Sequence, residues 1–284
     1  MEILFTVLYA VFIGFYNIFK KLSLQKSDGL VTLVFLTSTA FACSLIWIPF
    51  GVAVPFDLLL ILGLKGLLLA ISWFFVLKIL RTVDLTVVTA TDILSVVLSF
   101  VLGIIIFGES VTWLQTIGAV VILINIAAIN LCNRNGKGSA NKLQILGLIF
   151  SALVTATTCV IDKFTTTYLT PYQVQFWYLF FICVFSWVFF IIHCLRKRSF
   201  LIQKKDFANF WNYLIGIFLF LGDFFLFQAY KVPGSKMILI SILSKLKVII
   251  AILGGILIFK ERKVAKKIFF SLLVIAGTIL ISIF

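Results

Sequence analysis

The chain has 284 residues, of which 63% are hydrophobic and only 12% are charged. This composition excludes an ordinary soluble domain, in which roughly 45–50% of residues are apolar and about 25% are charged. The net charge of +14 does not indicate nucleic-acid binding, because the basic residues form short clusters between apolar runs and do not line one face. Their placement favours membrane orientation and contact with anionic lipid headgroups.

Ten apolar segments follow one another along the chain. As helices they are long enough to cross the roughly 30 Å hydrocarbon core of a bilayer, and their continuous runs differ from the alternation of barrel strands. The segments are 3–19, 30–50, 56–77, 85–107, 112–132, 143–161, 172–194, 209–230, 237–259 and 266–284. The sequence therefore predicts an all-α integral membrane protein with ten transmembrane helices.

The fourth and ninth segments end in similar sequences, which indicates an internal duplication. Residues 103–109 read Gly-Ile-Ile-Ile-Phe-Gly-Glu, and residues 255–261 read Gly-Ile-Leu-Ile-Phe-Lys-Glu. Each glutamate precedes a short loop and one last apolar segment, so the match has the same place in two sets of five segments. We expect a first five-helix repeat at 1–133, a linker at 134–142 and a second repeat at 143–284.

The basic residues predict how these repeats are oriented. An odd number of spans in each repeat requires the two to be inverted relative to each other in the membrane. The loops after the odd-numbered segments carry eighteen basic residues, whereas the remaining loops carry only Lys163, Lys231 and Lys236. The positive-inside rule then places the basic loops in the cytoplasm and both termini outside the cell membrane.

The duplicated unit resembles the ten-span EamA-like branch of the drug/metabolite transporter superfamily. The resemblance rests on Lys78 and Lys231, which end the third and eighth segments, and on the Gly…Phe-x-Glu endings of the fourth and ninth. It covers essentially the whole chain. It implies alternating access and a central cavity lined mainly by spans one to four and six to nine, with spans five and ten peripheral.

Two features depart from that family. Many members have a Trp-Gly pair in the first span, where this chain has Ile13, Gly14 and Phe15. Many also have cytoplasmic termini, which the distribution of basic residues contradicts here. The shared motifs are nearly silent on the substrate.

Five charged side chains fall deep inside predicted spans, where each costs roughly 2.5–3.5 kcal/mol on insertion scales and therefore points to function. They are Lys65, Asp92, Asp223, Lys245 and Lys247. We expect the lysines to attract a carboxylate or phosphate, and Asp92 or Asp223 to balance charge or carry a coupling proton. Tyr16 and Asn17 are expected to hydrogen-bond the substrate. The alternative is that the charged groups form interhelical ion pairs that only fix the packing.

The repeat also predicts which of these groups meet. At the offset of 152 between the duplicated motifs, Asp92 falls on Ser244 and Ser95 falls on Lys247. Residues three apart share one helix face, so equivalent faces of the two repeats can line one cavity. Asp92 and Lys247 would then face each other or a common ligand. Asp162 is expected near a span end, within reach of the interface.

The function that the sequence favours is secondary transport of a small polar metabolite, anionic or carboxylate-bearing, with proton coupling as an option. Two alternatives stay open: a flippase for a lipid or lipid-linked substrate, and a membrane-embedded transferase. The transferase would need clustered acid, base or nucleophilic groups near a membrane face.

The sequence does not predict an enzyme. It contains no GxxxxGK[ST], HExxH or GxSxG motif, and its single histidine is His193. Its five cysteines show no CxxC spacing, so neither a metal site nor a disulfide framework is expected. We expect no catalytic residues and no cofactor. The expected partners are a small-molecule substrate and the lipid bilayer, and no nucleic acid is expected. We expect the chain to be a monomer or a homodimer.

Overall fold

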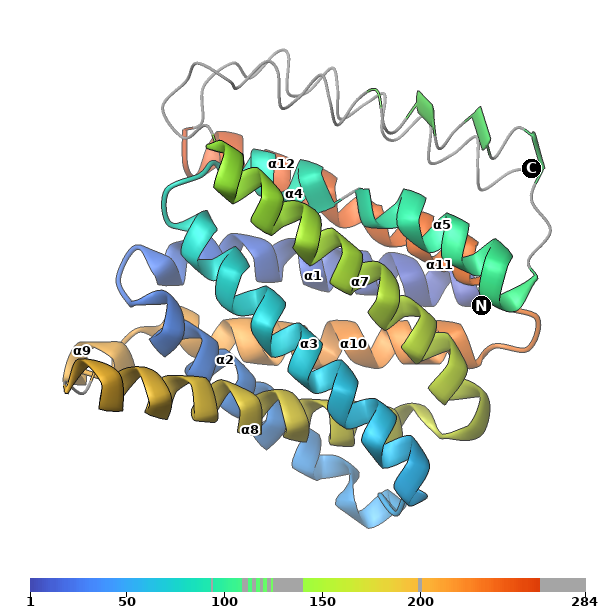
Figure 1. Ribbon diagram of the computed structural model, residues 1–284, viewed down its shortest axis with the longest axis horizontal. Coiled ribbons are helices and arrows are strands. Elements are labelled where there is room, and N and C mark those ends of the chain that lie inside the picture. Colours follow the sequence, from blue (N-terminus) through green and yellow to red (C-terminus); the bar gives the residue numbers. More distant parts are fainter. Residues whose placement is uncertain are drawn as a thin grey trace.

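The computed structural model describes residues 1–92, 94–108, 140–198 and 201–260, with isolated residues between 112 and 124 (Figure 1). The predicted segments 112–132 and 266–284 lie wholly or largely outside these ranges, as do Glu109, Glu261 and most of the predicted linker at 134–142. The secondary structure of the described part consists of helices.

All the other predicted segments are helical, and most of their bounds are close to the predicted ones. Seven of them are long and apolar enough to cross a membrane, counted over the described residues. The N-terminal set is α1 (Glu2–Leu24), α2 (Gly29–Ser44) with the 3-10 helix η1 (Leu45–Phe50), α3 (Phe56–Leu80), α4 (Leu85–Asp92) and α5 (Leu94–Phe107). The C-terminal set is α7 (Lys142–Tyr168), α8 (Pro171–Lys197), α9 (Lys204–Phe207), α10 (Phe210–Lys231), α11 (Met237–Leu243), η2 (Ser244–Leu246) and α12 (Lys247–Leu257).

Local sequence explains several helix starts. Asp28 caps α2, because its carboxylate accepts a hydrogen bond from the Leu30 backbone at 3.0 Å. Asn141 and Gln144 form a reciprocal capping box at the start of α7. Pro171 occupies the first turn of α8, where a missing N–H costs nothing.

Two helices continue past their predicted ends. We expected the first and sixth spans to stop at 19 and 161, before charged residues, but α1 runs to Leu24 and α7 to Tyr168. Lysine is a good helix former, and a charge does not interrupt the backbone hydrogen bonds of a helix. Lys20 and Asp162 consequently lie within helices.

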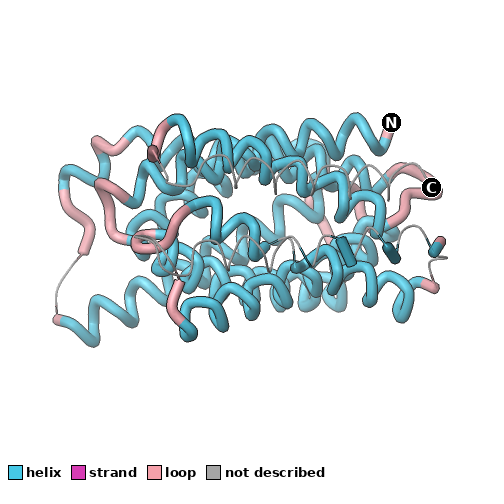
Figure 2. The backbone as a smooth tube through the Cα atoms, turned by 90° about the horizontal axis from the view of Figure 1, so that it is seen from above, coloured by secondary structure: helices cyan, strands magenta, loops and turns pink. Residues whose placement is uncertain are grey.

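The basic loops gather at one end of the bundle. The C-terminal ends of α1, α3 and α8 and the N-terminal ends of α2, α4, α7 and α10 lie on the left of Figure 1. The loops 25–28 and 81–84 and the described residues 201–209, which include α9, therefore share that side, which we call the basic end. Figure 2 shows the helices running lengthwise between loops at the two ends.

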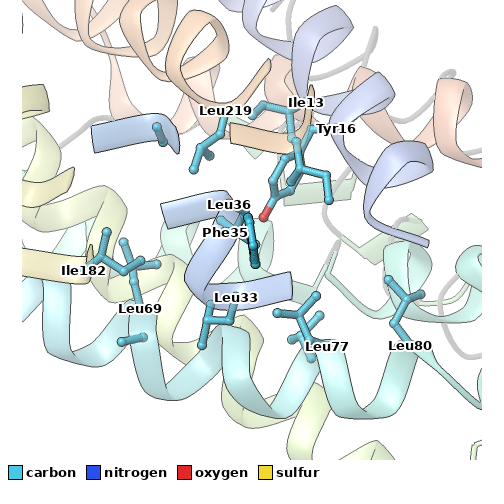
Figure 3. Packing of buried hydrophobic residues seen from close by; sticks show 14 of the residues in the cluster. Ile13, Tyr16, Leu33, Phe35, Leu36, Leu69, Leu77, Leu80, Ile182 and Leu219 are labelled. Carbon is cyan, nitrogen blue, oxygen red and sulfur yellow. The ribbon is translucent and has the colours of Figure 1, made fainter. Parts of the chain in front are cut away.

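The N-terminal and C-terminal helices pack in matched pairs. Helix α1 packs on α10 as α7 packs on α3, and α2 packs on α10 as α8 packs on α3. Likewise α12 packs on α1 as α5 packs on α7, and α11 packs on α5 as α4 packs on α12. Figure 3 shows part of the hydrophobic core among α1, α2, α3, α8 and α10, with the Tyr16 hydroxyl directed into the interior.

Glycines permit two of these matched crossings. A Cβ at Gly216 of α10 would lie 2.7 Å from the Leu36 carbonyl oxygen and 2.9 Å from the Ala40 nitrogen of α2. A Cβ at Gly66 of α3 would lie 3.0 Å from the Ile182 nitrogen of α8. Small residues allow helix backbones to approach this closely in membranes.

We expect Gly216→Ala to lower the free energy of unfolding by about 1–3 kcal/mol, because backbone atoms of α2 must shift to admit the methyl group. Thermal melting in detergent measures the effect. Gly63→Ala is the matched control, since its Cβ would only touch the Phe181 ring at 3.6 Å. Equal melting temperatures for the two variants would contradict the close approach.

Candidate functional site

A cavity of about 160 Å³ lies between the N-terminal and C-terminal helices. Its wall comes from α1, α3, α4, α7, α8, α10 and α12. Helix α1 contributes one face with spacings of three or four residues, namely Tyr9, Ile13, Tyr16, Asn17 and Lys20. Helix α7 contributes a similar face, namely Leu148, Ser151, Thr155, Thr158, Cys159 and Asp162. We call this space the central cavity.

Asp92, at the end of α4, forms ion pairs with two lysines of the C-terminal helices. Its Oδ2 lies 2.9 Å from the Lys245 Nζ and 3.1 Å from the Lys247 Nζ. Lys245 also donates to the Asp92 carbonyl oxygen at 3.2 Å and to the Ser95 Oγ at 2.8 Å. The structure thus brings Asp92 and Lys247 face to face, and it gives Lys245 a denser set of bonds.

Asp162 pairs with Lys65, which joins α7 to α3. Both side chains are buried, at 7% and 3% exposure. The expectation that Asp162 reaches the interface is therefore wrong, because α7 continues beyond it into the bundle. The Lys65 ammonium also lies 4.0 Å from the centroid of the Tyr178 ring and 4.7 Å from that of the Phe227 ring, a cation–π arrangement.

Asp223 has a different kind of partner. The Tyr178 hydroxyl donates a hydrogen bond to its Oδ2, and the same tyrosine ring lies against Lys65. Asp223 is therefore bound by a neutral group, whereas Asp92 and Asp162 are bound by lysines.

Lys20 is a cavity residue that the sequence analysis assigned to a loop. It is 8% exposed and lines the central cavity. Its ammonium lies 4.6 Å from the centroid of the Tyr16 ring, and within the described ranges no hydrogen bond or ion pair joins it to another residue. The spacing of Lys20 from Tyr16 and Asn17, four and three residues, was the signal that could have placed it on their face.

The predicted site residues fall into two groups. Six of them line the central cavity: Tyr16, Asn17, Lys65, Asp92, Asp223 and Lys247. The seventh, Lys245, borders a smaller neighbouring cavity instead. The walls of the two cavities together carry four lysines and three aspartates, namely Lys20, Lys65, Lys245, Lys247, Asp92, Asp162 and Asp223.

The rest of the wall is largely apolar. Trp73, Leu69, Val76 and Leu219 face the central cavity, and the rings of Trp73 and Tyr16 are 6.4 Å apart. Such a wall suits a ligand with an organic body and a few polar groups. Among the described residues, no cluster of three or more His, Cys, Asp or Glu side chains is placed to hold a metal ion.

Comparison with known proteins agrees with this architecture. A solved structure, described only as the crystal structure of a protein, aligns with a TM-score of 0.69 over 96% of this chain and 96% of its own, at 14% identity. That likeness shows a shared fold. No curated protein matches the chain.

The EamA-like transporter family matches residues 142–283, which begin at the first residue of α7. That segment is half of the chain. It includes α10 and α12, which supply Asp223 and Lys247 to the central cavity. The chain therefore belongs to the EamA-like transporter family, as its resemblance to the drug/metabolite transporter superfamily predicted.

Proposed function

We propose that this membrane transporter moves a small organic anion, carboxylate-bearing or phosphate-bearing, across the cell membrane. The observation that carries the proposal is Lys20, a buried cavity lysine with no carboxylate partner in the described part of the chain. A buried ammonium without a counter-ion is unfavourable. An anionic group of the substrate would supply that counter-ion.

The charges of the whole site support a monoanion. When all groups are ionised, the four lysines and three aspartates leave one positive charge, which a single carboxylate balances. The apolar wall around Trp73 and Leu69 would hold the rest of the substrate. A permanent cation is a poor fit because it would add to the existing surplus.

Alternating access is the proposed mechanism, with two inverted five-helix repeats moving relative to each other. The matched helix pairs support this, because the same crossings occur on both sides of the cavity. Ion pairs Lys65–Asp162 and Asp92–Lys247 join the two sets of helices. A substrate anion would compete with these aspartates for the lysines and so favour a rearrangement of the repeats.

A buried polar network at the basic end is the proposed gate on that side. The Ser23 hydroxyl of α1 donates to the Asn212 Oδ1 of α10. Asn209 Nδ2 donates to the Ser27 Oγ at 2.9 Å and to the Ser23 carbonyl oxygen at 3.3 Å. These hydrogen bonds tie α1 to α10, and they would have to break for the cavity to open there. Following the positive-inside rule, we place this end in the cytoplasm and both termini outside.

Asp223 is the proposed carrier of a coupling proton. Its bonded partner is the neutral Tyr178 hydroxyl, so protonation of Asp223 would break no lysine ion pair. Asp92 and Asp162, by contrast, would lose their attraction to lysines on protonation.

The test is a thermal-shift screen of the purified protein in detergent against monocarboxylates, phosphates, amino acids and amines. A ligand of the folded state at a hundred times its Kd adds about 2.7 kcal/mol of stability. We expect monoanions to raise the Tm and Lys20→Met to abolish that response. Stabilisation by amines, or a response that survives Lys20→Met, would contradict the proposal.

Lys21→Met is the matched control, because this neighbouring lysine lies over the Phe259 ring at 4.9 Å and does not line the central cavity. It should keep the response to anions. Without ligand, Lys20→Met should melt at or above the wild-type temperature, since an unpaired buried charge is replaced by an apolar side chain. A lower Tm would instead assign Lys20 a structural role.

A further inference from the structure

A second cavity, of about 20 Å³, adjoins the central cavity. It lies among α1, α5, α7, α10, α11, η2 and α12. Lys247 lines both cavities, whereas Lys245, Tyr230 and Ser241 line only the smaller one. We call this space the small cavity. Its volume suits one water-sized particle and excludes an organic acid.

Hydrogen-bond donors dominate the wall of the small cavity. The Tyr230 hydroxyl and the Ser241 hydroxyl are buried, each residue being 4% exposed, and neither has an oxygen or nitrogen partner among the described residues. The polar neighbour of Tyr230 is the Cys159 thiol, a weak acceptor. The neighbouring hydroxyls are already in use, because Ser244 donates to the Ser241 carbonyl oxygen and Ser95 donates to the Asp92 carbonyl oxygen, each at 2.7 Å. Two buried donors are therefore left without a strong acceptor.

The charge around the small cavity is positive. Lys245 and Lys247 both bond Oδ2 of Asp92, so one carboxylate faces two ammonium groups. Three hydrogen bonds occupy the three N–H groups of Lys245. Among the described residues, Lys247 pairs with Asp92 alone, so two of its N–H groups can reach a further acceptor.

We propose that the small cavity binds a monatomic anion of the size of chloride. Lys247, Tyr230 and Ser241 would donate hydrogen bonds to it, and its charge would neutralise the surplus of the lysine pair. A water molecule could also accept these bonds, but it would leave the positive charge uncompensated. This proposal does not depend on the identity of the transported substrate.

One consequence does rest on the proposed function. Because Lys247 borders both cavities, an anion in the small cavity lowers the positive potential at the central one. Chloride and the organic anion should therefore weaken each other's binding by the same factor.

The experiment measures binding of radiolabelled chloride to the purified full-length protein, in sulfate buffer of constant ionic strength and without any organic anion. We expect saturable binding of one chloride per chain, with competition by bromide but not by sulfate, which is too large for the small cavity. Non-saturable uptake, or equal competition by sulfate, would overturn the proposal and leave water as the occupant.

Two variants locate the site. Ser241→Ala and Tyr230→Phe each delete a hydroxyl that has no oxygen or nitrogen partner in the described structure, so the fold loses at most the weak contact of Tyr230 with the Cys159 thiol. Each should weaken chloride binding about tenfold or more, as expected for a hydrogen bond to a charged group. Ser186→Ala is the matched control, because this buried serine of α8 bonds the Ile182 carbonyl oxygen and lines neither cavity.

Unchanged chloride affinity in both hydroxyl variants would overturn the assignment to the small cavity. Lys20→Met separates this proposal from the previous one. That variant should lose the response to organic anions while it keeps chloride binding, so either proposal can fail without the other.

Discussion

Lys65→Met should lower the free energy of unfolding by about 3–5 kcal/mol, because Asp162 would keep a buried negative charge without its counter-ion. The two side chains are 3% and 7% exposed, so bulk solvent contributes little to the solvation of either charge. The substitution also removes the cation from the Tyr178 and Phe227 rings. Equilibrium unfolding in mixed detergent micelles measures the loss.

The double variant Lys65→Met with Asp162→Leu separates the ion pair from simple packing. Replacing a whole buried pair with apolar side chains is often neutral or stabilising, so it should recover most of the lost stability. A double variant whose loss equals the sum of the losses in Lys65→Met and Asp162→Leu would show that the two residues are not energetically coupled.

Arg81→Met is the control for burial, because it removes an exposed ion pair instead of a buried one. It breaks the ion pair between Arg81 and Asp28, whose atoms are 2.7 Å apart but whose side chains are 46% and 45% exposed. Exposed pairs contribute about 0–1 kcal/mol. A similar loss in Arg81→Met and Lys65→Met would contradict the argument that burial makes the difference.

The sequence predicted the helices well because hydrophobic runs of bilayer length leave few alternatives. The segment 30–50 became α2 and η1 over Gly29–Phe50, and 237–259 became the span Met237–Leu257. The interruption of that last span by a 3-10 turn at 244–246 was not foreseen. Hydropathy measures composition and is insensitive to a local change of helical hydrogen bonding.

The candidate site could be predicted only in part. The repeat offset placed Asp92 opposite Lys247, and their atoms are 3.1 Å apart. Lys20 and Asp162 were missed because charged residues served as markers of span ends. A charge ends an apolar run in sequence, but inside a bundle it can face a polar cavity while its helix continues.

Pairing was the feature that the sequence could not supply. Lys65 and Asp162 are 97 residues apart, and no periodicity within either helix relates them. The sequence therefore could not decide which lysines are neutralised and which are left for a ligand. That division separates Lys20, which has no carboxylate partner in the described part of the chain, from Lys65.

Lys245 and Lys247 should likewise differ, one being held by bonds within the protein and the other being available to a ligand. Lys245→Met should lower the free energy of unfolding by about 3 kcal/mol, roughly 1 kcal/mol for each hydrogen bond lost, because Lys245 makes three of them, to the Asp92 carboxylate, the Asp92 carbonyl oxygen and Ser95. Lys247→Met should cost about 1 kcal/mol, because Asp92 then keeps its bonds to Lys245. Unfolding in mixed micelles compares the two variants directly.

The effects on ligand binding should run in the opposite order. Lys247 lines the central cavity and Lys245 does not. The rise in Tm that organic anions cause should therefore be reduced more in Lys247→Met than in Lys245→Met, each variant being compared with its own Tm without ligand. Equal losses of stability and of anion response in the two variants would mean that Asp92 binds Lys245 and Lys247 equivalently. Unequal losses in the expected directions would mean that Lys245 fixes the position of Asp92, and that Lys247 is the group which Asp92 can release to a substrate.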